Sequence, residues 1–258
     1  MTASASKART DRPEGLPDVA GAGLREPRGA RRKRETRGKL LRAAFQLIAE
    51  RGVDGVAINE ITELADVGFG SFYNHFESKA AIHTAVLLAV FDAFGDALDA
   101  LTAGRDDPAE IIAIGVRHAI AYAGNEPLWG RLLLREWHHP EALSRGLGAR
   151  LLRDIGKGIA RNRFDVSDPL ITMIVAGGTV MAAVAAQVTL SSHGSKLFEQ
   201  SGFSAQNLDQ RAAAALLEGL GVTARAANAI AKRPLPAFEC APVIAGSSED
   251  RTRIAVRS

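Results

Sequence analysis

The sequence predicts an all-α protein, with an N-terminal helix-turn-helix domain followed by a larger helical domain. Leu, Ala, Arg and Glu, which are good helix formers, dominate the middle of the chain, and Gly or Pro interrupts them at helix-length intervals. No alternating apolar run is long enough to predict a strand. The 258 residues are 47% apolar and 24% charged, which suits one large or two modest globular domains.

The two ends of the chain predict disorder. Residues 1–33 are rich in Gly, Pro, Ala and Arg without a helical period, and residues 234–258 contain Pro and few periodic apolar positions. Residues 1–39 carry 11 Lys or Arg against 5 Asp or Glu. This basic arm is either a solvated leader or a segment that contacts a polyanion.

The first helix of the ordered region is expected near residues 36–51, where Thr36 can cap its start and Gly52 stands at the C′ position. Its apolar positions recur with a helical period: Leu40, Leu41, Ala44, Phe45 and Ile48. A short helix over 58–65, a turn at 66–68 and another short helix follow. This order predicts a helix-turn-helix preceded by a supporting helix.

The stretch ADVGFGSFYNHFESK, residues 65–79, concentrates aromatic side chains that are rare elsewhere. On a helix from Gly68, Phe72 and Phe76 share one face, and Phe69 and Tyr73 share another. We expect the first pair in the core and the second pair outside. Glycines in the first turn remove bulk where the helix must press against a partner, and Phe69 can pack on a thymine methyl.

Residues 37–82 resemble the DNA-binding domain of the TetR family of transcriptional regulators. The matching residues are Arg37, Leu41, Ala43, Ala44, Gly52, Ile61, Val67, Gly70, Tyr73, His75, Phe76, Ser78 and Lys79. Three positions depart from the family pattern. Ala57 replaces a capping Thr, Asp66 replaces a turn Gly, and Gly68 replaces a Ser.

The resemblance implies that residues 34–81 form a DNA-binding domain for double-stranded DNA. In the family, the positions of Ser71, Tyr73, His75 and Lys79 contact DNA. The predicted DNA-binding set comprises Arg37, Phe69, Gly70, Ser71, Tyr73, Asn74, His75 and Lys79. The basic arm before it is expected to reach along the backbone or into a minor groove.

The resemblance also implies that residues 82–233 form a helical domain that binds an effector and dimerises. Helices are expected at 79–102, 109–124, 127–137, 142–162, 169–191 and 204–220. The segment 169–190 lacks charged residues and is long enough to span a bilayer. However, it is poorer in Leu and Phe than a typical membrane-spanning helix, and it has no aromatic belt. We therefore expect a buried helix and no membrane.

Two small-residue-rich helices predict the subunit interface of a homodimer, as a four-helix bundle. The interface residues are expected to be Gly177, Gly178, Ala182, Ala185, Ala186, Ala213, Leu216 and Leu217. A small apolar or amphipathic effector is expected among His118, Tyr122, Trp129, Arg135, Trp137 and Met173.

The sequence contains no motif that indicates enzyme chemistry. The sequence has no G-x-S-x-G, C-x-x-C or H-E-x-x-H, and GFGSFY lacks the third glycine of a dinucleotide fingerprint. The adjacent His138 and His139 lack the i, i+3 or i+4 spacing of helical metal ligands, so neither metal nor cofactor is predicted. The lone Cys240 excludes an intrachain disulfide and suits a reducing, cytoplasmic location.

These observations predict a one-component transcriptional regulator, a repressor by family habit, that binds a pseudo-palindromic operator as a homodimer and is released by an effector. One alternative is a DNA-binding activator or co-regulator without a ligand. A second, from another class, is a small enzyme or membrane-anchored protein.

Overall fold

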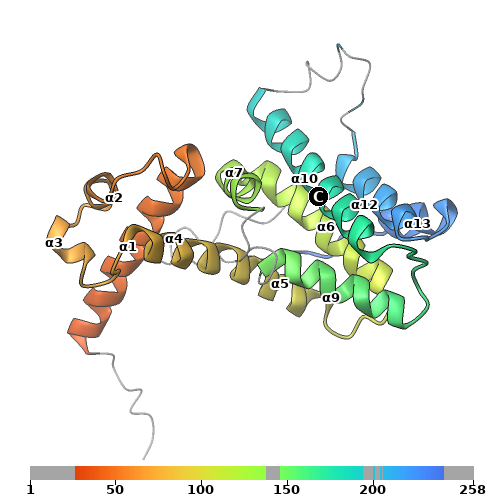
Figure 1. Ribbon diagram of the computed structural model, residues 1–258, viewed down its shortest axis with the longest axis horizontal. Helices are drawn as coiled ribbons and strands as arrows, with labels where there is room; N and C mark the ends of the chain where they lie inside the picture. Colours follow the sequence, from red (N-terminus) through yellow and green to blue (C-terminus); the bar gives the residue numbers. More distant parts are fainter. Residues whose placement is uncertain (1–26, 138–145, 194–199, 201–203, 205, 241–258) are drawn as a thin grey trace, which may run out of the picture.

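The structure, a computed structural model, describes residues 27–137, 146–193, 200, 204 and 206–240. Helices joined by short loops make up this part of the chain, and no strand occurs among the residues described. The predicted all-α fold is therefore confirmed. Figure 1 shows a small group of helices at one end and a larger bundle at the other, with a long helical segment running between them.

The small N-terminal domain consists of α1 (Arg28–Arg51), α2 (Ile58–Leu64) and α3 (Phe69–Phe72). α2 packs on α1, and α3 packs on α2 (Figure 1). Apolar side chains with less than 5% exposure form the core between them: Leu40, Ala44, Ile48, Ile61, Phe72 and Phe76. Their helical spacing in the sequence is what brings them onto one face of each helix.

The first helix begins earlier than the sequence predicted. α1 starts at Arg28, so residues 28–33 are helical rather than disordered, and Thr36 lies inside the helix instead of capping it. An ion pair of 3.4 Å between Arg31 and Glu35, one turn apart, supports this extension. The predicted C′ glycine is confirmed, because Gly52 ends the helix with φ +77°. Residues 1–26 of the predicted arm lie outside the described residues.

A continuous helical segment leads from the small domain into the larger one. It comprises α4 (Lys79–Leu87), the π-turn η1 (Leu88–Asp92) and α5 (Ala93–Thr102). Ser78 caps its start by accepting a hydrogen bond from the Ala81 N–H at 3.1 Å. The predicted helix 79–102 is therefore present, with one turn wound more widely than an α-helix.

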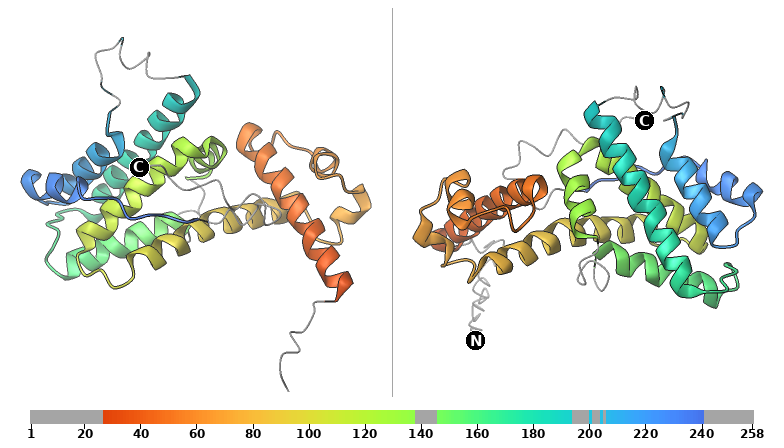
Figure 2. Two further views of the ribbon diagram at one scale, coloured as in Figure 1. Left: turned by 180° about the vertical axis from the view of Figure 1, so that it is seen from behind. Right: turned by 45° about the horizontal axis from the view of Figure 1, so that its top comes forward.

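The larger domain is built around α6 (Pro108–Asn125), which packs against the other helices of this domain. These are α7 (Pro127–Glu136), α9 (Gly146–Ala160), α10 (Pro169–His193), α12 (Leu208–Gly219) and α13 (Ala224–Ala231). Asp107 caps α6 and Pro108 occupies its first turn. Figure 2 shows α12 and α13 at the end of the molecule away from the small domain. The helix α13 was not predicted.

The helices expected to form a dimer interface differ in their exposure. On α10, Gly178 and Ala182 are exposed, and Gly177, Ala185 and Ala186 are partly exposed. On α12 the prediction is corrected, because each of the three named residues is at most 2% exposed within a single subunit: Ala213, Leu216 and Leu217. They pack where α12 meets α6 and α10, so their apolar side chains belong to the subunit core.

The segment after α13 is also not the disordered tail that was predicted, as far as residue 240. It runs across the larger domain (Figure 2, left view), and Phe238 is only 5% exposed. The Phe238 ring stacks on His118 with centroids 4.6 Å apart and lies 5.0 Å from the Phe94 ring. Residues 234–240 therefore complete the core, whereas the remainder of the predicted tail, 241–258, lies outside the described residues.

Candidate functional site

The aromatic stretch of the small domain separates into a buried and an exposed pair, as predicted. Phe72 and Phe76 are 0% and 4% exposed, whereas Phe69 and Tyr73 are each 53% exposed. The two exposed rings contact each other edge to face, with centroids 5.8 Å apart. Large exposed aromatic side chains on a small domain indicate a surface that contacts a partner.

The turn before α3 uses residues that the sequence comparison marked as unusual. Asp66 adopts a left-handed conformation with φ +52°, which a short polar side chain tolerates. Gly68 precedes α3 with φ −60°, a conformation open to any residue, and a Cβ there would meet Ser71 Oγ only at 3.9 Å. Glycine is therefore not required at position 68, and a serine would fit.

The start of α2 is half capped. Glu60 Oε2 accepts a hydrogen bond from the Ala57 N–H at 2.8 Å, and Glu60 Oε1 accepts one from Arg51 at 2.8 Å. These two hydrogen bonds hold the pKa of Glu60 below its usual value, that from Ala57 being the larger cause. Because alanine has no side-chain oxygen, the reciprocal bond of a capping box is missing.

Arg37 and Lys79, both predicted to contact DNA, make contacts inside the domain. Arg37 Nη1 donates to the His75 carbonyl at 3.1 Å, and its guanidinium lies 4.2 Å from the Phe76 ring centroid. Lys79 Nζ donates to the Val56 carbonyl at 3.1 Å. Both side chains therefore fix the loops around α3. DNA contact remains a prediction for them and for the other six residues of the set.

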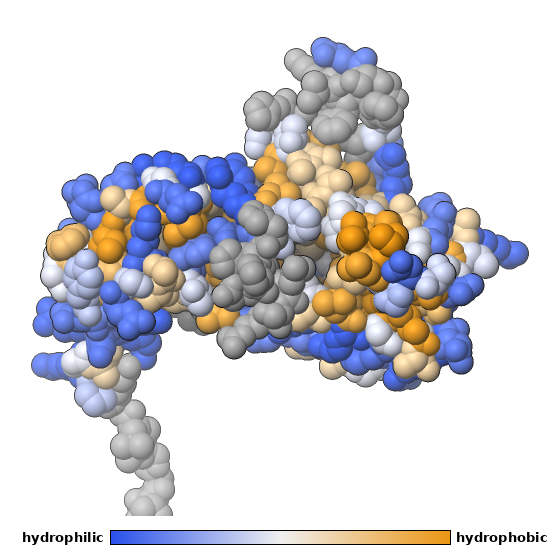
Figure 3. All heavy atoms as spheres, in the orientation of Figure 1, coloured by the Kyte–Doolittle hydropathy of each residue, from blue (hydrophilic) through white to orange (hydrophobic). Residues whose placement is uncertain are grey.

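His75 lies next to the basic extension of α1. Burial lowers the pKa of His75, and the positive charges of Lys33 and Arg37 lower it further. The helical extension thus brings basic side chains to the end of the aromatic stretch, residues 65–79. In Figure 3 hydrophilic residues cover most of this end of the molecule.

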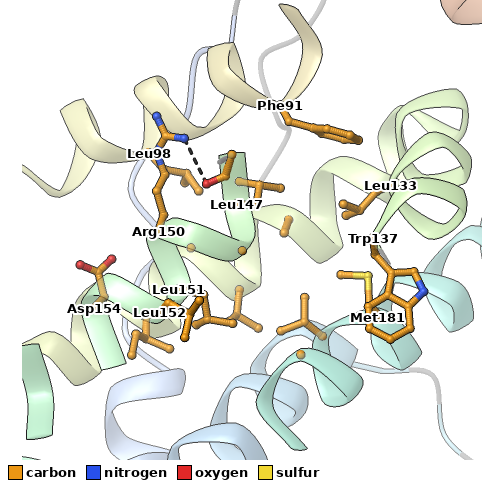
Figure 4. Close-up of a pocket in the computed structure, with 18 of the residues that line it drawn as sticks. Phe91, Leu98, Leu133, Trp137, Leu147, Arg150, Leu151, Leu152, Asp154 and Met181 are labelled. Atoms are coloured by element: carbon orange, nitrogen blue, oxygen red, sulfur yellow. Dashed lines mark hydrogen bonds between the residues drawn. The ribbon is translucent and has the colours of Figure 1, made fainter. Parts of the chain in front are cut away.

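A second candidate site is a cavity of about 500 Å³ in the larger domain. Its wall comes from α4, η1, α5, α6, α7, α9 and α10, and most of its lining is aliphatic or aromatic. The π-turn places Leu88 and Phe91 on this wall, consistent with the tendency of such turns to occur at functional sites. Figure 4 shows Trp137 and Met181 on one side of the cavity and Arg150 and Asp154 on the other.

The polar side of the cavity is a network of aspartates and arginines. Arg150 on α9 donates from Nε to Asp99 at 2.8 Å and from Nη2 to Asp96 at 2.5 Å. Arg153 joins Asp99 at 2.8 Å to Asp154 at 2.9 Å. Gly95 makes this possible, because a Cβ there would stand 2.4 Å from the Arg150 guanidinium carbon.

The charges of this network leave it slightly acidic. Its carboxylates belong to Asp92, Asp96, Asp99 and Asp154, and its cations to Arg150, Arg153 and Lys157. Burial acts to raise the pKa of Asp99, but hydrogen bonds from Arg153 and Arg150 outweigh it and hold the pKa below its usual value. The site therefore presents ionised carboxylates and suits a neutral hydrogen-bonding ligand better than an anion.

The predicted effector residues do not lie together. The structure places Trp137 and Met173 on the cavity wall. His118, Tyr122 and Trp129 instead belong to a buried aromatic cluster with Phe91, Phe94 and Phe238. This placement corrects the expectation for these three side chains, which support the core.

Arg135 is also away from the cavity wall. It extends from α7 to the C-terminal end of α1 and donates to the Ala49 and Glu50 carbonyls at 3.1 and 2.7 Å. Its predicted place beside an effector is therefore corrected as well. The Arg135 guanidinium therefore links α7 of the larger domain to α1 of the small domain.

Sequence reasoning missed the aspartate–arginine network. The sequence predicted helices over these residues but assigned none of them to a site. One signal was present, since Asp92, Asp96 and Asp99 share a helix face, and so do Arg150, Asp154 and Lys157. Among the described residues no three His, Cys, Asp or Glu side chains are grouped to hold a metal ion. His138 and His139 lie outside the described residues.

Family comparisons cover both domains. Residues 40–86 match the family described as "Bacterial regulatory proteins, tetR family", and residues 107–233 match "Tetracyclin repressor-like, C-terminal domain". Among solved structures, RolR in complex with resorcinol is 36% identical, with a TM-score of 0.56, over 80% of this chain and 98% of RolR. RolR without ligand is 35% identical, with a TM-score of 0.60, over 78% of this chain and 99% of RolR.

Curated relatives match over shorter stretches. The transcriptional regulator TcmR of Streptomyces glaucescens is 32% identical over 99 residues, which is 38% of this chain and 42% of TcmR. The transcriptional repressor DhaR of Mycobacterium sp. (strain GP1) is 48% identical over 52 residues, which is 20% of this chain and 26% of DhaR. The chain thus matches about a quarter to two fifths of these relatives' length.

Proposed function

Because this chain belongs to the TetR family of bacterial regulatory proteins, we propose that it represses transcription by binding an operator as a homodimer and is released by a small effector. The family is one of DNA-binding transcriptional regulators, and curated relatives include repressors. The operator, the dimer and the effector are the parts of the proposal that need their own support.

Support for operator binding comes from the exposed aromatic pair on α3 and its basic surroundings. A recognition helix in a major groove uses the side chains that its own domain does not bury. Phe69 and Tyr73 are such side chains, and the basic extension of α1 lies close enough to affect His75. Gly70, where a Cβ would meet nothing within 4 Å, leaves space beside them.

The observation that carries the effector proposal is the apolar cavity with the aspartate–arginine network on one side. Apolar walls favour a ring or short hydrocarbon, and ionised carboxylates favour hydroxyl donors over anions. We therefore propose a neutral, hydroxylated aromatic compound. RolR, which aligns over most of this chain, was solved with resorcinol, a compound of this class.

The dimer is supported by the exposed face of α10. Four large apolar side chains near its N-terminal end are at least 50% exposed: Leu170, Ile171, Ile174 and Val175. Figure 3 shows apolar residues over this part of the molecule. Farther along the same helix Gly178 and Ala182 permit close approach of a second helix. Leu170 and Ile174 also line the cavity, so a partner seated here would cover its open side.

A membrane location is the weaker reading of the same helix. Lys79–Thr102 and Pro169–Ser192 are long and apolar enough to cross a membrane by length and composition. However, the first connects the two domains and includes the cavity wall, and the second packs on α6, α7 and α12. We propose a cytoplasmic protein whose α10 is covered by a partner subunit.

The proposal is tested by fluorescence anisotropy of the full chain on labelled DNA from upstream of its own gene, with random duplex as competitor. We expect operator binding that survives the competitor and weakens when resorcinol is added. Benzoate, an anion of similar size, should have a smaller effect. Operator binding that no neutral phenol alters would favour the alternative, an activator or co-regulator without a ligand.

Two matched variants locate the effector site. Asp99→Asn removes the carboxylate that joins Arg150 to Arg153 on the cavity wall, so the resorcinol response should fall. Asp96→Asn changes a side chain that binds the same Arg150 but is 74% exposed, so its response should stay near that of the wild type. Equal responses in the two variants would contradict the proposed site.

A further inference from the structure

The cavity of the larger domain is much larger than a single aromatic ring requires. An engineered protein cavity of about 150 Å³ is large enough to hold benzene, whereas this cavity measures about 500 Å³. Apolar space of this kind does not fill with ordered water, and a wall without packing partners loses its dispersion contacts. A phenol with one ring would therefore leave more than half of the cavity unpacked.

The charged residues of the cavity wall form one connected patch. Among the described residues that line the cavity, the charged ones all belong to the aspartate–arginine network: Asp92, Asp99, Arg150 and Asp154. Arg150 pairs with Asp92 at 3.9 Å and with Asp99 at 2.8 Å, and Arg153 joins Asp99 to Asp154. Hydroxyl groups of a ligand therefore find carboxylate acceptors in one part of the cavity.

The opposite end of the cavity is apolar. Figure 4 shows Leu133, Trp137 and Met181 on the side away from Arg150 and Asp154. Trp137 is 44% exposed although it lines the cavity, so its indole has surface for a further apolar contact. Because the described wall carries no charged side chain at this end, a charged group placed there would lose water without meeting a counter-charge.

We infer that the effector has two parts: a hydroxylated ring at the aspartate–arginine end, and a neutral apolar extension that fills the end with Trp137 and Met181. The extension is an alkyl chain or a second ring. This inference rests on the proposed function, which assigns the hydroxylated ring, and it names the part that selects among such compounds. Each methylene buried at the apolar end should strengthen binding by about fourfold until the cavity is filled.

The direction of the extension follows from the positions of the hydroxyl groups. In a 1,3-dihydroxybenzene both hydroxyls lie on one edge of the ring, and carbon 5 lies on the opposite edge. When the hydroxyls donate to the carboxylates of Asp99 and Asp154, a substituent on carbon 5 points away from the network and toward Trp137. A substituent on carbon 2 lies between the hydroxyls and meets the network. The two isomers therefore distinguish a directed site from unspecific hydrophobic binding.

The test compares resorcinol, 5-pentylresorcinol and 2-pentylresorcinol on the full chain. Calorimetry measures their affinities, and the anisotropy assay measures the release of operator DNA. We expect 5-pentylresorcinol to bind at least about tenfold more tightly than resorcinol and to release the operator at a lower concentration. The 2-pentyl isomer should bind no more tightly than resorcinol.

Two results on the wild type overturn the inference. If resorcinol acts and 5-pentylresorcinol binds no more tightly, the apolar end does not receive a ligand, although the proposed effector class stands. If the two pentyl isomers gain affinity equally, the chain binds without a defined direction. Either result contradicts a two-part site.

Two matched variants locate the extension. Met181→Trp enlarges a side chain at the apolar end, and Leu152→Trp enlarges one on the other side of the cavity, near Asp154 (Figure 4). Met181→Trp should abolish the preference for 5-pentylresorcinol over resorcinol, whereas Leu152→Trp should keep it. Melting temperatures identify the variants that fold, and Met181→Phe, a smaller enlargement, takes the place of Met181→Trp if that variant does not. An equal preference in the two variants contradicts the placement of the extension.

A wild type on which resorcinol has no effect leads to two distinguishable outcomes. If 5-pentylresorcinol alone binds and releases the operator, a single ring is too small for the cavity, which supports the two-part site. If none of the three compounds binds, the proposed effector class is wrong, and the two-part effector is overturned with it.

Discussion

Each domain contains side chains whose burial departs from what is usual for their residue type, and the two departures are opposite. The small domain exposes the aromatic rings of Phe69 and Tyr73, and the larger domain buries the charged groups of Glu136 and Asp154, each 6% exposed. An exposed aromatic ring is available to pack against another molecule, whereas a buried charged group forms ion pairs or hydrogen bonds within its own chain. The first arrangement therefore indicates binding, and the second indicates a fixed geometry between helices.

Phe72 and Phe69 provide the sharpest contrast within the small domain. Phe72→Ala should lower the free energy of unfolding by about 3–5 kcal/mol, since the ring is fully buried. Phe69→Ala, on the same short helix, should change it by less than about 0.5 kcal/mol. Urea unfolding followed by circular dichroism measures both. Similar losses in the two variants would mean that the exposed ring also serves the core.

The burial of His118 should make the free energy of unfolding depend on pH. Burial, and then the charge of Arg117, lower the pKa of His118 to about 4. Below about pH 6.5 the imidazole of His118 is protonated in the unfolded chain, whereas in the folded chain it stays neutral until about pH 4. The free energy of unfolding should therefore fall by about 3 kcal/mol as the pH decreases from 6.5 to 4.

The measurement for this prediction is urea unfolding at a series of pH values. His118→Gln removes the titrating group, so its stability should change less over this range than that of the wild type. The carboxylates with lowered pKa, Asp99 and Asp107, titrate mainly below it. Parallel pH profiles for the variant and the wild type would show that His118 is not the group responsible.

Replacement of Tyr73 should affect operator binding rather than folding. Tyr73→Ala should weaken operator binding by about 5- to 150-fold, the loss of one specific contact of about 1–3 kcal/mol. Its melting temperature should remain near that of the wild type, because the ring is 53% exposed. Ile159→Ala, at an exposed apolar position on α9, serves as the control. Unchanged anisotropy titrations for Tyr73→Ala would remove the exposed pair from the recognition surface.

The smallest effect concerns the cap of α2. Ala57→Thr supplies the hydroxyl missing from the capping box and should stabilise the protein by about 1 kcal/mol. Ala57→Val has nearly the same shape without the oxygen. A higher melting temperature for threonine than for valine is the expected outcome, and equal values would show that Glu60 alone satisfies this helix end.

The small domain could be predicted from sequence because its signals are local. Gly52, the apolar period of α1 and the spacing of Phe72 and Phe76 all operate within a few residues. Residues 28–33 were missed because a helix that is polar on all sides has no apolar period, even though Arg, Lys and Glu favour helices. The early start of α1 follows from such propensity and from ion pairs like Arg31–Glu35.

The cavity could not be predicted in the same way. Its wall collects side chains from Thr84 to Met181, and no local pattern records which of them meet. Of the aromatic residues chosen from the sequence, Trp137 lies on the cavity wall, whereas Tyr122 and Trp129 belong to the buried core. Phe238 was missed for the same reason, because its burial depends on His118 and Phe94, which are far away in the sequence.

The position of Phe238 has a consequence for how the protein matures. A chain is synthesised from its N-terminus, and domains generally fold as they become complete. The small domain has all its core residues by the end of α4, whereas the aromatic cluster of the larger domain lacks a ring until residue 238 has been made. We therefore expect the small domain to complete its core first and the larger domain to complete its core afterwards.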